Sequence, residues 1–144
     1  MVKDKKDEEE TMSEEKIKGS CLCGQVNYRV TGKMSDIVHC HCITCRKAHG
    51  SAFSSVAAVN DRDFSVTSAE PLSSYESSPG KTRYFCANCG TQIYAKREEK
   101  NHLILRLGSL DTDIVAKEKH HIWVSQKAQW YSINSHLPEC SEFE

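Results

Sequence analysis

The sequence has 144 residues, of which 38% are hydrophobic, so it suits a single domain with a modest core. Its 19 basic and 20 acidic side chains nearly cancel, which argues against a domain that neutralises nucleic-acid phosphates. No apolar run approaches the roughly 18 residues that cross a bilayer, and the charged N-terminus lacks the apolar stretch of a secretory signal. We therefore expect a cytoplasmic protein with reduced thiols and without nucleic-acid or membrane partners.

The two ends of the chain are predicted to be tails. Residues 1–16 mix acidic and basic side chains with almost nothing apolar. Such a segment cannot bury enough surface to offset the entropy lost on ordering, so we predict a disordered charged tail. Residues 139–144 are predicted as a short polar C-terminal tail. The single domain is expected to span residues 17–138.

From residue 17 onward the pattern is mostly β. Polar and apolar residues alternate, or short apolar runs stand between turn residues, and both patterns indicate strands. The expected strands are 25–30, 51–59, 64–66, 72–75, 81–85, 92–96, 102–107 and 121–124. Residues 77–80 read as a tight turn, and 110–119 are expected to contain a short helical turn. The fold class predicted is therefore mainly β with short helical turns.

Seven of the eight cysteines fall into three short clusters. The clusters are Cys21-Leu-Cys23-Gly24, Cys40-His-Cys42-Ile-Thr-Cys45 and Cys86-Ala-Asn-Cys89-Gly90. Loops this short let two or three thiolates converge on one Zn²⁺, which binds sulfur at about 2.3 Å in a tetrahedral array. A glycine after two of the pairs lets the backbone curl around the ion. We predict two zinc ions per chain, with disulfides as the alternative.

The simplest pairing joins the first cluster with the third and leaves the second by itself. Four sulfurs would then surround one zinc completely, as in a structural site, and three would hold another with an open position, the usual arrangement of a catalytic zinc. The four-cysteine group is Cys21, Cys23, Cys86 and Cys89. The three-cysteine group is Cys40, Cys42 and Cys45. Spacing along the chain does not fix pairing between clusters, so other pairings stay open at this point.

A histidine ligand is the alternative to an open position in the three-cysteine group. His49 lies four residues after the last of these cysteines, and His39 and His41 flank Cys40. His41 stands between two ligands, where its side chain is expected to point away, so it is the least suitable. Cys140, alone near the C-terminus, is expected to be a free thiol.

The order of these motifs resembles the glutathione-dependent formaldehyde-activating enzyme family, which also includes centromere protein V. The resemblance covers nearly everything from Gly19 to Leu137. The matching motifs are Gly19-Ser-Cys-Leu-Cys-Gly24, His41-Cys-Ile-Thr-Cys-Arg46, Ser78-Pro79-Gly80, Phe85-Cys-Ala-Asn-Cys-Gly-Thr91, Gly108-Ser-Leu-Asp111 and His121-Ile-Trp-Val124.

The resemblance implies a β-tent fold with two zincs, the closed site matching the four-cysteine group and the catalytic site matching the three-cysteine group. The founding activity is condensation of glutathione with formaldehyde to S-hydroxymethylglutathione, formally a carbon–sulfur lyase reaction in reverse. We therefore expect a zinc-dependent carbon–sulfur lyase that acts on a glutathione adduct or a related thiol hemithioacetal. The alternatives are a non-catalytic two-zinc scaffold that binds a protein, and a zinc-binding or thiol-redox module.

Five further residues are candidates for roles at the catalytic site. Arg46 follows the last zinc ligand and could steer a substrate carboxylate, or else hydrogen-bond the carbonyls of its loop. Ser51 and His49 are candidates for proton transfer. Trp123 and Trp130 could form the wall of a pocket or simply pack in the core.

Overall fold

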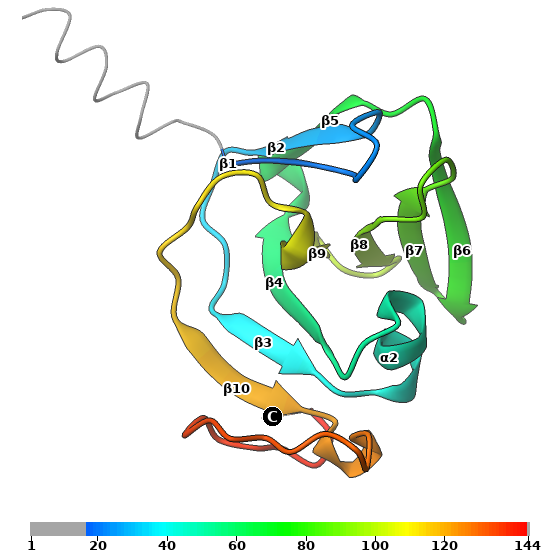
Figure 1. Ribbon diagram of the computed structural model, residues 1–144. Helices are drawn as coiled ribbons and strands as arrows, with labels where there is room; N and C mark the ends of the chain where they lie inside the picture. Colours follow the sequence, from blue (N-terminus) through cyan, green and yellow to red (C-terminus); the bar gives the residue numbers. More distant parts are fainter. Residues whose placement is uncertain (1–16, 144) are drawn as a thin grey trace, which may run out of the picture.

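The computed structural model describes residues 17–143, which fold into two β-sheets and one short α-helix, α2 (Figure 1). The predicted tail over residues 1–16 lies outside the described residues. The smaller sheet has the order β1-β2-β5, with β1 at Ile17–Ser20, β2 at Asn27–Val30 and β5 at Phe64–Ser68. The prediction of a mainly β fold with short helical turns is confirmed.

The larger sheet has seven strands in the order β10-β3-β4-β9-β8-β7-β6. All neighbours are antiparallel except β10 and β3, which run parallel. The strands are β3 Ile37–Cys40, β4 Ser54–Asn60, β6 Leu72–Ser78, β7 Lys81–Cys86, β8 Gln92–Arg97, β9 His102–Arg106 and β10 Glu118–Ile122. Three 3₁₀ turns follow β4, β9 and β10, at Asp61–Asp63, Leu107–Ser109 and Val124–Gln126.

The seven-stranded sheet uses its two faces differently. Side chains of residues paired across neighbouring strands point to the same face. On one face, Val59 pairs with Leu103 in register, and both are buried in the hydrophobic core. On the other face, Ala58 pairs with Ile104, and Ile104 pairs in turn with Ala95. The second face lines a cavity, so we call it the cavity face.

The core lies between the first face and the smaller sheet. Tyr28 and Val30 of β2 are 1% exposed, and Leu105 of β9 is fully buried. The Tyr28 hydroxyl is hydrogen-bonded to Ser109 Oγ at 2.7 Å. Its ring occupies the space where a side chain at Gly19 would lie, so the strand pairing of β1 requires glycine there.

Figure 1 shows that the larger sheet curves, so that α2 lies between the β10–β3 end and the β7–β6 end. This helix, Ile43–His49, was not predicted as a helix. Cys42 caps its N-terminus by accepting a hydrogen bond from Cys45 N on Sγ, and Gly50 ends it with φ 60°. Because of this helix and turn, the strand predicted at 51–59 begins only at Ser54.

The helical turn predicted within 110–119 is wrong. The 3₁₀ turn ends at Ser109, and the backbone N–H groups of Asp111 and Thr112 both donate to Lys18 O. Lys18 N in turn donates to Thr112 Oγ1 at 2.9 Å. The start of this segment is therefore held as an extended partner of β1, with Leu110 in an antiparallel bridge to Gly19.

The last residues of the chain run beside β10. His121 N donates to Pro138 O, Cys140 N donates to His121 O, and Trp123 N donates to Glu142 O. None of the helices within residues 17–143 has the length and hydropathy needed to cross a bilayer.

Candidate functional site

The four-cysteine group brings together sulfurs from two separate turns. Its four Sγ atoms lie within 4.8 Å of one another, with 3.5 Å between Cys21 and Cys23 and 3.8 Å between Cys23 and Cys86. A tetrahedral zinc with bonds of about 2.3 Å requires sulfurs about 3.8 Å apart, so the donor set fits this ion. The eight cysteines are all free thiols, and the disulfide alternative finds no pair in the structure.

Both turns of this group are preorganised. Gly24 and Gly90 have φ values of 81° and 82°, and Gly24 N donates to Cys21 O while Gly90 N donates to Cys86 O. Positive φ is accessible to glycine without strain. Thr91 links the turns, since its Oγ1 accepts from Leu22 N and hydrogen-bonds Cys89 Sγ at 3.2 Å.

The thiols of the four-cysteine group have unequal acidities. The Thr91 hydroxyl and backbone hydrogen bonds lower the pKa of Cys89 to about 5. Burial raises the pKa of Cys86 to about 11. The Asn88 side chain and a backbone hydrogen bond lower the pKa of Cys23. Cys89 is thus a thiolate near pH 7, which is the form that binds a metal, and the pKa of Cys23 is shifted in the same direction.

The three-cysteine group lies where β3 runs into α2. Cys40 ends β3, Cys42 caps the helix and Cys45 lies in its first turn. Their sulfurs also lie within 4.8 Å of one another. Hydrogen bonds with Cys40 and Cys42 lower the pKa of Cys45, whereas hydrogen bonds with Cys42 and Cys45, together with burial, raise the pKa of Cys40.

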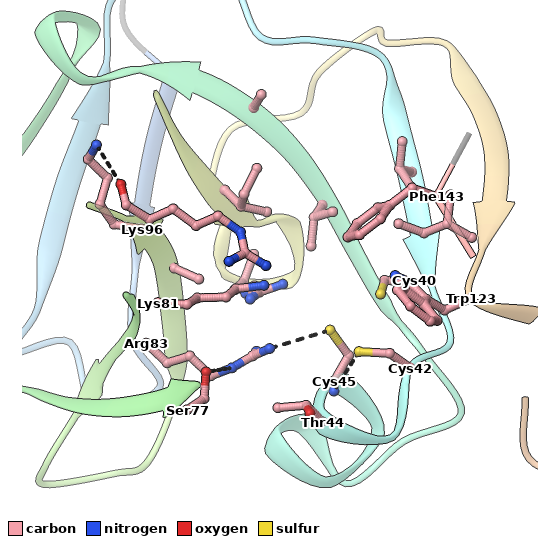
Figure 2. Close-up of a pocket in the computed structure, with 18 of the residues that line it drawn as sticks. Cys40, Cys42, Thr44, Cys45, Ser77, Lys81, Arg83, Lys96, Trp123 and Phe143 are labelled. Carbon is pink, nitrogen blue, oxygen red and sulfur yellow. Dashed lines mark hydrogen bonds between the residues drawn. The ribbon is translucent and has the colours of Figure 1, made fainter. Parts of the chain in front are cut away.

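The three-cysteine group borders a cavity of about 720 Å³ on the cavity face of the larger sheet (Figure 2). Trp123 and Phe143 stand on the Cys40 side, with ring centroids 5.1 Å apart in an edge-to-face contact. On the opposite side, Lys81 and Arg83 of β7 extend toward the cysteines. The four-cysteine group does not line this cavity.

The sequence pattern that defines the glutathione-dependent formaldehyde-activating enzyme family matches residues 16–126, a segment that contains both cysteine groups. The chain belongs to this family.

The relatives differ in the share of their own length that aligns with this chain. A Halomonas elongata protein whose name assigns it to the same family is 30% identical over 129 residues, which are 83% of this chain and 82% of that protein. A Schizosaccharomyces pombe protein named as an uncharacterized lyase is 34% identical over 76 residues, 53% of this chain and 54% of its own. A Rhodobacter sphaeroides crystal structure, at 24% identity, matches with TM-score 0.58 over 68% of this chain and 91% of that one, and shows the fold alone.

No histidine of residues 17–143 joins the three sulfurs in this family member. His39 is hydrogen-bonded to Ser55 Oγ at 2.8 Å and to Glu118 Oε1 at 2.6 Å. The ring of His41 is fully buried and hydrogen-bonded to His121 at 2.8 Å, and burial lowers the pKa of His41 to about 4. As predicted, the His41 side chain is directed away from the three sulfurs, toward His121.

His49 is the remaining histidine that the sequence offered as a ligand or for proton transfer. Burial and the charge of Arg106 lower the pKa of His49 to about 4, so its ring is neutral near pH 7. Its Nε2 is buried without a hydrogen-bond partner. His49 is not among the residues that line the cavity. Its proposed proton transfer is untested and remains a prediction.

Three other predicted residues lie together on a separate hollow. Arg46, Ser51 and Trp130 line it, and Trp130 is 72% exposed. Arg46 Nη1 donates to Gln126 O at 2.8 Å, which is the loop-carbonyl contact considered as the alternative to carboxylate binding. Ser51 Oγ donates to Phe53 O at 2.7 Å. Of the two tryptophans, only Trp123 lines the cavity beside the three-cysteine group.

The sequence reasoning missed the cations of the cavity face. Arg83 and Arg106 are only 5% and 3% exposed, and both line the cavity together with Lys81. A basic residue that alternates with apolar ones ordinarily marks the solvent side of a strand. Nothing in the sequence pattern of β7 and β9 shows that their basic side chains face the same cavity as Cys40.

Proposed function

We propose that this family member is a zinc-dependent carbon–sulfur lyase acting on a glutathione adduct or a related thiol hemithioacetal. One observation carries the proposal: the three-cysteine group, and not the four-cysteine group, borders the large cavity. Three thiolates leave a fourth position of a tetrahedral zinc for a substrate sulfur. The family name and the lyase named among the relatives support the same reaction class. We propose a cytoplasmic location for the enzyme.

Zinc held by Cys40, Cys42 and Cys45 would favour the thiolate form of a substrate thiol. In the synthetic direction the thiolate attacks the aldehyde carbon, a carbon–sulfur bond forms, and the carbonyl oxygen receives the π electron pair and then a proton. In the lyase direction the hydroxyl loses its proton, the carbon–sulfur bond breaks and the thiolate leaves with the electron pair.

The chain's own residues shape the place of reaction. Trp123 and Phe143 form an aromatic side of the cavity, which excludes water and strengthens the electrostatic interactions inside it. Arg46, predicted as a catalytic residue, is proposed instead to position the group. It ties α2 to Gln126 O, and Gln126 Oε1 accepts from Ile43 N at the start of the helix.

The test is the zinc content and turnover of the Cys42→Ser variant. The expected result is loss of about one of two zincs and a fall of at least about 100-fold in cleavage of S-hydroxymethylglutathione. Cys140→Ser is the matched control, because Cys140 belongs to neither group, and it should keep both zincs and full activity. Full activity of Cys42→Ser with two retained zincs would refute the proposal.

The protein-binding scaffold makes a different prediction for the same preparation. Wild-type protein with two zincs, no turnover and no change in melting temperature on addition of glutathione would favour it. Greater protection by glutathione than by S-methylglutathione at the same concentration would indicate a thiol that binds through sulfur.

A further inference from the structure

We propose that Lys81, Arg83 and Arg106, which we name the cationic wall, form a subsite for a carboxylate of the substrate. The inference rests on the proposed function, since it concerns the ligand whose sulfur lies at the three-cysteine group. Lys81 and Arg83 come from β7 and Arg106 from β9, and all three line the cavity. Figure 2 shows Lys81 and Arg83 across the cavity from Trp123 and Phe143, with the labelled cysteines between.

The guanidinium of Arg83 is fixed at one end and open at the other. Its Nε donates to Ser77 Oγ at 3.0 Å, across the β6–β7 hairpin. Its Nη2 makes only a long contact of 3.9 Å with Cys45 Sγ, and its Nη1 is buried without a hydrogen-bond partner. The Ser77 contact therefore holds the planar group in an orientation that leaves donors for a ligand.

Arg106 is still less satisfied. It is 3% exposed, yet its Nε and Nη2 have no hydrogen-bond partner. A buried donor on a charged group is costly unless something accepts its hydrogen bond. Arg46 provides the contrast within the same molecule, because its Nη1 is satisfied by Gln126 O. The missing acceptors of the cationic wall point to a ligand that brings its own.

The charges around the cavity favour an anion. Three thiolates with one divalent cation carry a net charge of −1, which does not balance the three cations of the wall. Arg97 and Lys100 also line the cavity, as does Lys96, whose Nζ is ion-paired with Asp61 Oδ2 at 3.1 Å, and Glu99 is the only acidic residue among the described residues that do.

A carboxylate is the anion that best matches this geometry. Two guanidinium groups present flat, paired donors, and carboxylate oxygens accept such pairs bidentately. The ligand class is therefore a small acidic thiol or thioether. Its sulfur lies at the three-cysteine group, its carboxylate contacts Arg83 and Arg106, and its apolar part lies toward Trp123 and Phe143.

The experiment compares two ligands that lack a thiol. S-methylglutathione retains both carboxylates, whereas in its dimethyl ester both are replaced by uncharged ester groups. Isothermal titration of zinc-loaded protein should give at least about tenfold weaker binding of the ester. Arg106→Gln should weaken binding of the acid at least about tenfold and change binding of the ester less than about twofold. Arg29→Gln removes the same charge from an exposed position of β2 and should change neither.

A second variant protects the test against a folding failure. Arg83→Lys keeps the charge and loses the paired N–H donors of the guanidinium, so it should weaken binding of the acid by about threefold. Each variant should retain two zincs and the wild-type melting temperature. Equal binding of acid and ester by the wild-type protein would overturn the proposal. Displacement of S-methylglutathione by inorganic phosphate at lower concentration than by succinate would assign the wall to a phosphoryl group and also overturn it.

The carboxylate subsite and the proposed lyase function can each fail while the other stands. If acid and ester are discriminated through Arg106 but S-hydroxymethylglutathione is not cleaved, the carboxylate subsite stands and the lyase function fails. If cleavage is measured and the discrimination is absent, the lyase function stands and the subsite fails.

Discussion

The two cysteine groups present the same kind of ligand atom in different surroundings. Cys21 and Cys86 of the four-cysteine group belong to the hydrophobic core and are 4% and 0% exposed, whereas Cys23 is exposed and Cys89 is half-buried. The three-cysteine group lines the cavity, with charged side chains across from it. We therefore expect a metal held by the four-cysteine group, which lies away from the cavity, to exchange more slowly than one held by the three-cysteine group, which a ligand can reach through the cavity. The difference suggests that the surroundings of the sulfurs, and not the sulfurs alone, would separate a structural from a reactive centre.

The largest effect is expected from Cys86→Ser. This change removes a fully buried ligand of the four-cysteine group and leaves a hydroxyl in the core. Because structural zinc binding is coupled to folding, the variant should lose several kcal/mol of stability. Its melting temperature, followed by circular dichroism, should fall by more than about 10 °C. A melting temperature within about 2 °C of wild type would show that the two groups do not differ as described.

A smaller effect should separate neighbouring residues of β9. Leu105 is fully buried in the core, and Ile104, on the other face, lines the cavity. Leu105→Ala should lower the free energy of unfolding by about 2–5 kcal/mol. Ile104→Ala, as the matched control, should lower it by under about 1.5 kcal/mol. Urea unfolding of the zinc-loaded proteins measures both values, and equal losses would contradict the division between core face and cavity face.

Chelation should distinguish the groups without any mutation. EDTA added to the zinc-loaded protein should remove one equivalent of zinc quickly and the second at least about tenfold more slowly. The melting temperature should change mainly with the second. Zinc release can be followed with a colorimetric indicator. A single phase that releases two equivalents would show that the three-cysteine group is no more accessible than the other.

The smallest effect is a pH shift in the four-cysteine group. The pKa of Cys89 is lowered in the folded protein, so its thiolate adds stability above the usual thiol range, and this stability is lost as pH falls through about 5. Thr91→Val removes the hydroxyl that is the main cause, so zinc should be released at a pH a few tenths of a unit higher. Thr67→Val, on an exposed position of β5, is the control.

The sulfur chemistry was predictable from the sequence because each cluster is local. Cysteines two to five residues apart in one cluster lie close together in space whatever the rest of the fold. The two groups also form as the simplest pairing of the clusters predicted. The β class was predictable from alternation. The course of residues 43–49 was not, because this short helix has no apolar stripe and depends on its cap, Cys42, and on Gly50.

The cavity could not be predicted from local patterns. The cavity is lined by residues of strands that are far apart in the sequence, such as β3, β7, β9 and β10. The alternation of polar and apolar residues predicts strands but not their order in the sheet. Arg83 and Arg106 are 23 residues apart, yet share a face through register pairs with β8 and β4. Arg46, adjacent to a ligand, was the better candidate by sequence and lies on a different hollow.

The two halves of the four-cysteine group are far apart in the sequence, and this separation sets the order in which the two cysteine groups can form. Cys23 and Cys86 are 63 residues apart, whereas Cys40 at the end of β3 and Cys45 in the first turn of α2 belong to one short segment. Closing a long loop costs more entropy than closing a short one, and it requires the second half to have left the ribosome. During synthesis the three-cysteine group is therefore expected to be complete first. The four-cysteine group can form only after Cys89 has left the ribosome, and Phe143 is the last of the cavity-lining residues to do so.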